Sequence, residues 1–585
     1  MQYPKLMELE TSRQIVDTFK GYNHNLRISD GEFFDMKNMT ADFYPILSPR
    51  GKRGVYASLK KSDGMIAKDS LCYVDGSEFV INGQRVNMGL YYNPDAAPKQ
   101  LISMGAYVII LPDKMYINTM DLTDFGMIEA HYASEHDVTF ELCTITGDTY
   151  TDTTVSDTAP SEPEDMDMWI DISSEPHTLK RYSEASEMWV TVPTTYIKIH
   201  SIGIGKAFKQ YDGVTISGIN KKGLTHLNGS HVIWGCGEDY LVVTGILDKW
   251  GYQEAVDGAI TVERKMPIMD FVIESENRLW GCRYGVADNG EIVNEIYASK
   301  LGDFKNWNCY MGLSTDSYTA SCGTDGPFTG AITHLGYPLF FKENCVHKVY
   351  GNYPANYQIQ TTVCRGVQKG CHQSLAIVNE TLFYKSRGAV CAYDGSLPVE
   401  ASYALGNELY SDAVAGSHGN KYYISMKDLT ENWHLFVYDV AKGMWHREDD
   451  LHADAFCDCR GELYAIDHDS KKIITMLGSG QQDTKSVDWM VQTGPIGIGM
   501  PDMKYISRLT VRMSLELGAR VYFLIQYDSM GEWKHIYTTS GTTLRSFAVP
   551  IRPRRCDHFR LRIIGEGDAR IYSITKTIEQ GSDIS

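Results

Sequence analysis

Few side chains in this sequence have the types and spacing that chemistry at a metal or a substrate requires. Cys457 and Cys459 are the closest pair of cysteines, and His452, Asp454 and His468 lie near them. Thiolate, imidazole and carboxylate groups are metal ligands, so a metal site is conceivable here. The one-residue gap between the cysteines is not the C-x2-C spacing of structural zinc, and it would place both side chains on one face of a strand. We therefore expect strand packing at this position and no metal.

Motifs of catalysis and cofactor binding do not occur in the sequence. Gly203-Ile204-Gly205-Lys206 lacks the spacing and the hydroxyl residue of a phosphate-binding loop and indicates a β-turn. The sequence contains no H-E-x-x-H and no G-x-S-x-G motif. Glycosidases need two carboxylates that flank the scissile bond, and 74 acidic residues do not single out such a pair. We expect no catalytic residue and no cofactor, and hence a protein that is not an enzyme.

Two sets of side chains could contact a partner. The basic run could touch DNA or an acidic neighbouring subunit, or it could form a solvated or salt-bridged loop; it consists of Arg552, Arg554 and Arg555. Large aromatic side chains could anchor an interface or pack in the interior; the candidates are Trp169, Trp250 and Trp307.

The charge of the chain argues against one class of function. Its 55 basic and 74 acidic residues give a formal net charge of −19. A protein that binds nucleic acid by neutralising phosphates needs a basic surface instead. An acidic wall past which DNA slides is compatible with this charge, because repulsion prevents adhesion. We therefore expect that DNA in contact with this protein passes it without sequence-specific binding.

The cysteines and the apolar segments bear on the compartment. Thirteen cysteines without framework spacing predict reduced thiols that pack as small hydrophobic side chains. No stretch approaches the roughly 20 apolar residues that a membrane-spanning helix requires. The first residues, Met1 to Lys5, run into polar sequence and do not have the pattern of a secretory signal. We expect the chain to stay where it is made unless it leaves as part of a particle.

The elements that must position these residues are β-strands. Glycine (52) and tyrosine (37) are abundant, and short alternating runs end in Asp-Gly or Asn-Gly turns. Residues 107–118 illustrate the pattern, because they indicate a hairpin with Pro112-Asp113 at its tip. The sequence therefore predicts an all-β protein.

A two-strand unit recurs through the centre of the chain. Its spacings are 60, 43, 40 and 41 residues, measured between the presumed first-strand anchors Leu279-Trp280, Leu339-Phe340, Leu382-Phe383, Tyr422-Tyr423 and Leu463-Tyr464. A period of about 40–45 residues built from hairpins is typical of the four-stranded blades of a β-propeller. Each blade exposes apolar faces that its neighbours must cover, so the units must close into a ring. A chain of β-sandwiches also places turns at regular intervals and is the alternative.

The repeat and the breaks in it divide the chain into four parts. Residues 129–263 do not fit the repeat and begin with an acidic passage, 151–167, that indicates a solvated loop. Residues 478–482 have the composition of a flexible linker. The predicted parts are an N-terminal arm (1–54), a propeller of six to eight blades (55–128 and 264–480), an inserted β-domain (129–263) and a C-terminal β-sandwich (481–585).

Short islands of sequence carry a resemblance to a known family. The first runs from Phe19-Lys20-Gly21-Tyr22-Asn23 through Asp30-Gly31-Glu32 and Asn38 to Pro49-Arg50-Gly51. A second contains Tyr297-Ala298-Ser299 and Gly302-Asp303-Phe304-Lys305-Asn306-Trp307, and a weaker one lies at 565–574. Together they resemble the phage tail nozzle, or tail-hub, proteins, which stabilise packaged DNA. The motifs are structural rather than catalytic, and the region 129–263 has no counterpart in them.

The resemblance implies a virion protein of a phage tail, assembled in the host cytoplasm. It implies a closed homo-oligomeric ring, usually a hexamer, around the channel that DNA traverses. Such a ring retains the packaged genome and connects to other tail proteins, namely an adaptor and fibres or a spike. Contacts that close by rotation would generate the ring.

Two other functions stay open. The chain could be a receptor- or carbohydrate-binding tail protein that uses the inserted or the C-terminal domain. The less favoured alternative is a glycan-cleaving propeller enzyme, because propellers host glycosidases.

Overall fold

The computed structural model describes residues 11–581 except 136, 151–152, 253–258, 288–289, 483–485 and 501. The described residues form strands β1 to β52 and four short 3-10 helices, η1 (Thr225–Leu227), η2 (Pro354–Asn356), η3 (His372–Ser374) and η4 (Tyr403–Leu405). This confirms the predicted all-β class. Within these residues, no helix is long and apolar enough to cross a membrane. The chain divides into two compact units, one of residues 1–100, 340–346 and 361–585, the other of 101–339 and 347–360.

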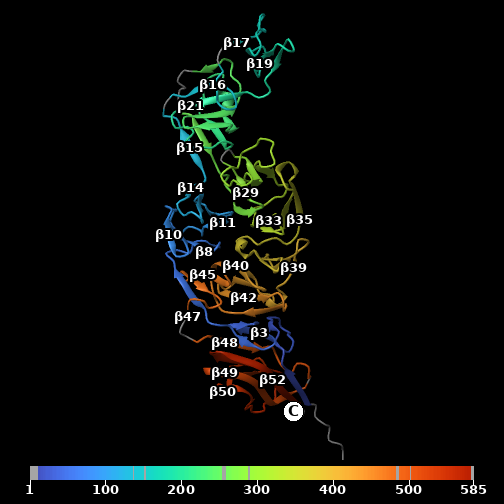
Figure 1. Ribbon diagram of the computed structural model, residues 1–585. Helices are drawn as coiled ribbons and strands as arrows, with labels where there is room; N and C mark the ends of the chain where they lie inside the picture. Colours follow the sequence, from blue (N-terminus) through green and yellow to red (C-terminus); the bar gives the residue numbers. More distant parts are fainter. Residues whose placement is uncertain are drawn as a thin grey trace, which may run out of the picture. The chain divides into compact units, whose positions relative to one another are not determined.

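Four-stranded antiparallel sheets of the propeller type make up much of the first unit (Figure 1). They are β7–β10 (Met65–Ala67, Leu71–Asp75, Glu78–Ile81, Gln84–Asn87), β36–β39 (Ala376–Val378, Thr381–Lys385, Val390–Tyr393, Val399–Glu400), β40–β43 (Tyr410–His418, Lys421–Asp428, Trp433–Asp439, Met444–Arg447) and β44–β46 (Ala453–Cys459, Glu462–Asp467, Lys472–Thr475) with β6 (Gly54–Ser58).

Strand β6 comes from the N-terminal region and completes the propeller-type sheet that is last along the chain. It pairs antiparallel with β46, from Lys472 opposite Ser58 to Thr475 opposite Gly54. Without β6, β46 would be an open sheet edge with unpaired backbone groups. The first propeller residues are thereby joined to the last ones.

The flexible linker predicted at 478–482 is wrong. β47 (Gln481–Gln482) pairs with β6, and the Glu462 carboxylate accepts the backbone N–H groups of Leu477 at 2.7 Å and Ser479 at 3.0 Å. A Cβ atom on Gly54 would lie 2.1 Å from the Ser479 carbonyl oxygen, so the segment is packed against β6. The glycines and polar residues that resemble a linker serve close backbone approach instead.

The anchors of the repeat lie on the second strand of each sheet, not on the first as predicted. Leu382-Phe383 lies on β37, Tyr422-Tyr423 on β41 and Leu463-Tyr464 on β45. Inner strands carry the strongest apolar signal, because strands flank them on both sides and sheets can cover both faces. The predicted spacings are therefore those between successive second strands.

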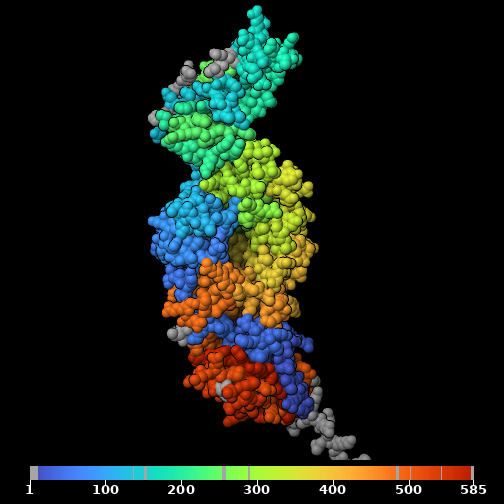
Figure 2. All heavy atoms as spheres, viewed as in Figure 1, coloured from blue at the N-terminus to red at the C-terminus, as the bar shows by residue number. Residues whose placement is uncertain are grey.

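The N-terminal arm pairs with both the C-terminal strands and the propeller. β1 (Thr11–Val16) pairs with β52 (Ala569–Gln580), β3 (Glu32–Lys37) with β48 (Asp488–Thr493), and β2 (Gly21–Tyr22) with β43. One sheet therefore continues from the C-terminal strands through the arm into β40–β43. Figure 2 shows the blue N-terminal residues lying against the red C-terminal ones.

The C-terminal strands form a curled, sandwich-like arrangement around one long strand. β49 (Lys504–Tyr527) pairs through its first half with β52 and through its second half with β51 (Phe559–Glu566). β50 (Lys534–Val549) follows β49 along most of its length. The apolar side chains of β49 alternate with exposed ones and are almost fully buried at Val511, Val521 and Phe523.

A cluster of four partly buried charges fixes the end of the arm on the propeller. Arg53 contacts Glu448 and Asp449 at 2.7 Å each, and Arg50 contacts Asp449 at 3.1 Å and Glu448 at 3.6 Å. Burial opposes ionisation of Asp449, but Arg53 and Arg50 outweigh it and hold the pKa of that carboxyl below its usual value. β4 (Met39–Thr40) and β5 (Ser48–Pro49) precede this cluster along the arm.

Three propeller-type sheets lie in or partly in the second unit. They are β11–β14 (Gln100–Met104, Tyr107–Leu111, Met115–Asn118, Phe125–Met127), β28–β31 (Phe271–Ser275, Arg278–Val286, Ile292–Ala298, Tyr318–Ser321) and β32–β35 (Gly330–His334, Tyr337–Lys342, Cys345–Tyr350, Gln358–Val363). β12 and β13 form the hairpin that was predicted at Pro112-Asp113. Among the described residues, the propeller-type sheets number seven.

Residues 129–263 fold into separate sheets with their own core. These are β15 (Ala130–Ala133), β27 (Thr261–Arg264), β22 (Gly213–Ser217) and β23 (Gly229–Val232); β24 (Gly235–Gly237), β25 (Tyr240–Thr244), β21 (Tyr196–His200), β16 (Thr139–Cys143) and β26 (Gly251–Tyr252); and β17 (Thr153–Ser156), β18 (Met168–Asp171), β19 (Thr178–Ser183) and β20 (Met188–Thr191). The loop predicted at 151–167 is wrong in part, because β17 pairs parallel with β18. Residues 151–152 of it lie outside the described residues.

The inserted region is tied to the propeller-type sheets by one buried carboxylate. Asp212 forms an ion pair with Arg264 and accepts a hydrogen bond of 2.9 Å from the Asn306 amide. Arg264 also donates to the Ile128 carbonyl at 3.2 Å, and Asn306 accepts the Gly213 N–H at 2.9 Å. Both ends of the insertion are therefore connected to the motif that contains Asn306.

We predict that Arg53→Met destabilises the protein by about 3–5 kcal/mol, because it leaves the two carboxylates of Glu448 and Asp449 with Arg50 as the one remaining cation of the cluster. Urea denaturation followed by tryptophan fluorescence would measure this. The matched control is Arg365→Met, which removes a cation from the exposed pair with Glu400 at 3.3 Å. The control should cost no more than about 1 kcal/mol. Equal losses in the two variants would contradict the role given to the cluster.

We predict that His446 makes the protein less stable as the pH falls below 6.5. Burial, followed by the charge of Lys421, lowers the pKa of His446 to about 3. Between these values the unfolded chain binds a proton that the folded chain does not, so stability is lost with decreasing pH. At pH 5 the loss from this residue is about 2 kcal/mol, at 1.36 kcal/mol per pH unit.

The slope of unfolding free energy against pH, measured between pH 7 and pH 5, tests this assignment. His446→Gln should flatten the slope relative to the unsubstituted chain, whereas His200→Gln at an exposed position should leave it unchanged. Identical slopes for all three proteins would show that His446 is not the titrating group.

Candidate functional site

Of the two roles left open for the three tryptophans, two of them take the interior one and not that of an interface anchor. Trp169 is 5% and Trp307 is 2% exposed. Each indole N–H donates to a backbone carbonyl, Trp169 to Ser156 at 3.1 Å and Trp307 to Phe304 at 3.0 Å. A satisfied N–H lets the large ring pack inside. Trp250 is partly buried against the core of the inserted region.

The basic run lies on an exposed loop between β50 and β51. Arg552, Arg554 and Arg555 are exposed, and the Arg554 guanidinium lies 5.2 Å from the ring centre of Tyr527. A role in contacting DNA or an acidic subunit stays a prediction.

Cys457 and Cys459 lie on strand β44 and pack there as predicted, Cys459 buried and Cys457 partly buried. Both contribute to one apolar cluster beside β44 and β45, and burial raises the pKa of the Cys457 thiol to about 12. All thirteen cysteines are free thiols. His452, Asp454 and His468, which the sequence places near them, come together at the opposite end of the same sheet.

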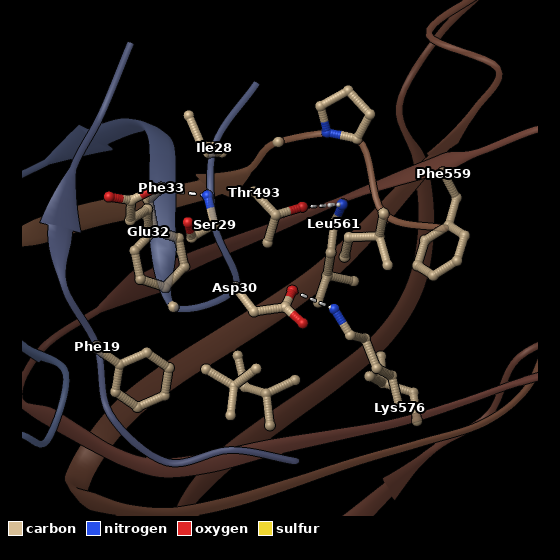
Figure 3. A pocket seen from close by; sticks show the side chains of 17 residues that line it. Phe19, Ile28, Ser29, Asp30, Glu32, Phe33, Thr493, Phe559, Leu561 and Lys576 are labelled. Carbon is tan, nitrogen blue, oxygen red and sulfur yellow. Dashed lines mark hydrogen bonds and ion pairs between the residues drawn. The ribbon is translucent and has the colours of Figure 1, made fainter. Parts of the chain in front are cut away.

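A small apolar cavity lies between the arm and the C-terminal strands (Figure 3). Its volume is about 50 Å³, and Phe19, Phe33 and Leu561 are among the residues that line it. At its edge, Lys576, almost completely buried, donates to the Asp30 carboxylate at 2.6 Å. The cavity holds at most a small number of water molecules. Its residues serve to seat the arm.

A more polar pocket lies at the tips of two adjacent hairpins in the second unit. Its volume is about 150 Å³. Pockets that enclose drug-sized ligands measure about 300–1,000 Å³, so this one suits a ligand of the size of a single sugar ring. We call it the tip pocket; its lining residues are Ser275, Glu276, Trp280, Leu335, Gly336, Tyr337, Pro338, Val349, Gly351, Asn352 and Tyr357.

The two hairpins that form the tip pocket have two-residue turns. Glu276 and Asn277 join β28 to β29 with φ of 49° and 62°, and Leu335 and Gly336 join β32 to β33 with φ of 51° and 80°. Positive φ at both central residues is typical of type I′ turns, whose twist matches that of the strands. The Thr333 hydroxyl donates to the Glu274 carbonyl and connects the two hairpins. The turns therefore carry Glu276 and Leu335 to the rim of one pocket.

The third side of the tip pocket is the loop between β34 and β35. Asn356 orders it, because its side-chain oxygen accepts the N–H groups of Asn352 at 3.0 Å and Tyr353 at 3.1 Å. Gly351 has φ of 116°, and a Cβ there would lie 2.7 Å from the Asn356 carbonyl oxygen. The loop thus places the exposed Asn352 amide at the pocket.

Aromatic rings form the wall of the tip pocket. The ring centres of Trp280 and Tyr357 are 5.0 Å apart at 69°, and Tyr318 lies behind them, 5.0 Å from Tyr357. Lys348 covers one side of Tyr337, with its Nζ 4.2 Å from the ring centre. Burial raises the pKa of Tyr357, so its hydroxyl stays protonated at neutral pH.

A buried arginine supports this wall from below. The Arg278 guanidinium donates to the carbonyl oxygens of Asp316 at 2.6 Å and of Ser299 and Ser314 at 2.8 Å each, and it lies 6.0 Å from the ring centre of Tyr357. Burial lowers the pKa of Arg278. The carbonyl cage holds Arg278, and through it Tyr357, in one position.

The polar groups of the tip pocket are suited to binding hydroxyls. The Ser275 hydroxyl oxygen is buried and has no hydrogen-bond partner among the described residues. A buried polar group without a partner costs about 1–3 kcal/mol, which a ligand hydroxyl would relieve. Glu276 is exposed at the rim and is the one carboxylate among the described residues that line the pocket. The lining of the pocket thus contains one carboxylate, whereas glycoside cleavage uses two.

The sequence alone does not reveal this pocket. Trp280 was recognised as a repeat anchor, but Ser275, Glu276, Tyr337 and Asn352 were not singled out. Their convergence depends on two hairpins more than 50 residues apart in the chain. The Glu276-Asn277 turn after a strand was the one local signal, and similar turns recur elsewhere.

Comparisons with known proteins give distant structural neighbours alone. No protein-family profile and no curated protein sequence matches the chain. An exo-β-1,3-galactanase from Phanerochaete chrysosporium matches with 7% identity and a TM-score of 0.22, covering 52% of this chain and 94% of its own. The sialidase of Trypanosoma rangeli matches with 10% identity and a TM-score of 0.21, covering 97% and 95%. An engineered glycoside hydrolase matches with 8% identity and a TM-score of 0.20, covering 53% and 96%.

These neighbours correct one prediction. The chain was expected not to be an enzyme, whereas the three proteins above are glycan-cleaving enzymes by name. At these TM-scores and identities they assign no residue, substrate or reaction to this chain. The chain is an all-β protein with propeller and sandwich-like sheets, and its function has to be argued from its own residues.

Proposed function

We propose that this chain is a carbohydrate-binding protein of a bacteriophage tail. The tip pocket carries the first part of the proposal, because it combines an aromatic wall with unsatisfied and exposed polar groups in a volume of about 150 Å³. The resemblance of the sequence islands to tail nozzle and hub proteins supports the second part.

A sugar ring has apolar and polar groups, and the tip pocket offers partners for both. The apolar C–H groups of a sugar pack against the exposed parts of Tyr337 and Tyr357, since aromatic side chains provide large contact surfaces. Its hydroxyls then reach the Glu276 carboxylate, the Asn352 amide and the Ser275 hydroxyl. A few placed polar groups on an aromatic wall are what orients a small ligand in a pocket. The carboxylate also favours neutral sugars over acidic ones, because like charges repel.

The residues that carry the family resemblance have structural roles, which suits a component of a large assembly. A Cβ on Gly21 would lie 2.3 Å from the Trp445 carbonyl oxygen, so a side chain there would push β2 away from β43. Asp30 pairs with the buried Lys576, and Arg50 belongs to the charge cluster. These residues fix the arm to two other parts of the chain.

We predict that the full-length chain binds neutral glycans of host surfaces and that Glu276→Gln weakens this binding at least tenfold. One lost charge-assisted hydrogen bond of about 1.5–3 kcal/mol corresponds to this factor or more. A glycan array would identify the ligand, and isothermal titration calorimetry would measure the affinity. Glu380→Gln is the matched control, because Glu380 occupies the equivalent turn between β36 and β37 with φ of 67°.

These experiments distinguish three cases: the pocket binds glycans, it cleaves them, or it does neither. Binding that Glu276→Gln weakens and Glu380→Gln leaves unchanged supports the proposal. Release of sugar fragments that stops in Glu276→Gln would make the same pocket part of a glycosidase site. Binding that is equal in both variants, or no glycan binding at all, would contradict the assignment of the pocket.

A second candidate function is a ring subunit of the tail nozzle or hub. It is favoured by the net charge of −19, which suits a channel wall that DNA passes without adhering. We predict that the protein in intact particles forms a closed ring of about six copies, by heterologous contacts that close on rotation. Native mass spectrometry and low-resolution imaging of particles would show this ring. A monomer or a trimer at the particle tip would contradict it and fit receptor binding.

A further inference from the structure

Three potential metal ligands meet at one end of the sheet β44–β46. His452 lies in the loop before β44, Asp454 lies on β44, and His468 follows β45 directly. One ligand atom from each residue lies within 4.8 Å of the others. Two imidazoles and one carboxylate are a ligand set that first-row transition metals accept, with the remaining positions open to water.

The backbone holds these three residues together independently of their side chains. The His468 N–H donates to the His452 carbonyl oxygen at 3.0 Å. The β44–β45 ladder has a bulge between Ala453 and Ala455, which is the position of Asp454. A bulge redirects a side chain relative to the regular alternation of a strand. The sheet therefore presents the carboxylate beside both histidines.

The side chains are already arranged as a partly assembled site. The His468 Nδ1 lies 2.9 Å and 3.0 Å from the two Asp454 carboxylate oxygens. The His452 ring stacks on Trp433 at 3.8 Å and on His468 at 4.0 Å between ring centres. Asp469 lies 3.9 Å from the His452 Nδ1. A carboxylate next to a ligating histidine is the usual outer partner that orients the ring.

We propose that His452, Asp454 and His468 bind a divalent transition-metal ion, with Zn²⁺ as the probe. Zinc–ligand distances of about 2.0–2.2 Å in a tetrahedral site place two ligand atoms about 3.3–3.6 Å apart. The three ligand atoms lie within 4.8 Å of one another, so the side chains must move together by at most about 1.5 Å to hold the ion. The His468 side chain is 54% exposed, which gives the ion an entry path and the ring freedom to turn. A bound ion replaces the hydrogen bond between His468 and Asp454 and connects the loop before β44 to the turn after β45.

The site differs from the one that the sequence suggested. The cysteines of that stretch lie in the apolar cluster, and neither belongs to the group of ligand atoms that lie within 4.8 Å of one another. The expectation of no metal rested on their spacing. The two histidines and the aspartate form a site without them.

The test uses the full chain without a histidine tag and Zn²⁺ alone. Isothermal titration calorimetry should show one ion per chain, and His468→Ala and His452→Ala should each weaken binding by about 100-fold or more. Loss of a residue that only orients a metal ligand lowers metal affinity by about 10–100-fold. We expect Asp469→Asn to weaken Zn²⁺ binding within that range. The control is His418→Ala. The His418 Nδ1 also lies 3.0 Å from an aspartate, Asp458, but among the described residues His418 belongs to no group of three potential ligands.

Two further measurements do not depend on calorimetry. Zn²⁺ should raise the thermal midpoint of the unsubstituted chain and leave that of Asp454→Asn unchanged, with circular dichroism confirming that the variant folds. Ni²⁺ should quench the fluorescence of Trp433, and Trp433→Phe should bind the ion without that part of the quenching. Zn²⁺ binding that persists in both histidine variants, or no binding by the tag-free chain, would overturn the proposal.

Discussion

The structure of the first unit depends on the ion pairs between the arm and the strand β43. Arg50 and Arg53 come from a segment near residue 50, and Glu448 and Asp449 follow β43 some 400 residues later. Taking these charges out of water is costly, so the arrangement is stable only when all four are present. Strand β6 begins directly after Arg53 and must pair with β46. The cluster therefore helps to fix the register between β6 and β46. Without it, the last propeller-type sheet would keep an open edge.

The arm around this cluster explains why the sequence islands have their particular residues. Asn38 connects three segments: its amide donates to Asp488, its side-chain oxygen accepts from Arg50, and its N–H donates to Glu448. Gly31 has φ of 93°, and a Cβ there would lie 2.4 Å from the Thr18 carbonyl oxygen. Asn38 and Gly31 thus each lie where separate segments of the chain approach closely. A resemblance carried by such positions reports a shared way of connecting parts, and it bears on architecture more than on chemistry.

How far the sequence predicts this protein follows from the range of the interactions involved. The β-class, the 40-residue recurrence and the hairpin at Pro112-Asp113 are local, because alternation and turn residues act over a few positions. The segment 478–482 could not be predicted, since its glycines serve contact with β6, which is remote in the chain. The burial of Trp169 and Trp307 depends on carbonyl partners that only the folded loops supply. The same holds for the tip pocket, which is assembled from separate turns. His452, Asp454 and His468 are close in the sequence and were candidates from it, and the fold adds that their ligand atoms lie within 4.8 Å of one another.

The tip pocket shows how a repeated turn acquires a distinct role. Glu276, Glu380 and Glu431 all occupy hairpin turns with positive φ, at 49°, 67° and 66°. A glutamate at such a position is strained relative to glycine, so the turn alone gives no reason for a function at one of them. At Glu276 alone of these three, the carboxylate borders a pocket with Trp280, Tyr357 and the unpartnered Ser275 hydroxyl. The neighbouring hairpin and the loop after β34 supply that environment. The proposed binding site therefore depends on adjacent sheets and not on the turn at Glu276 alone.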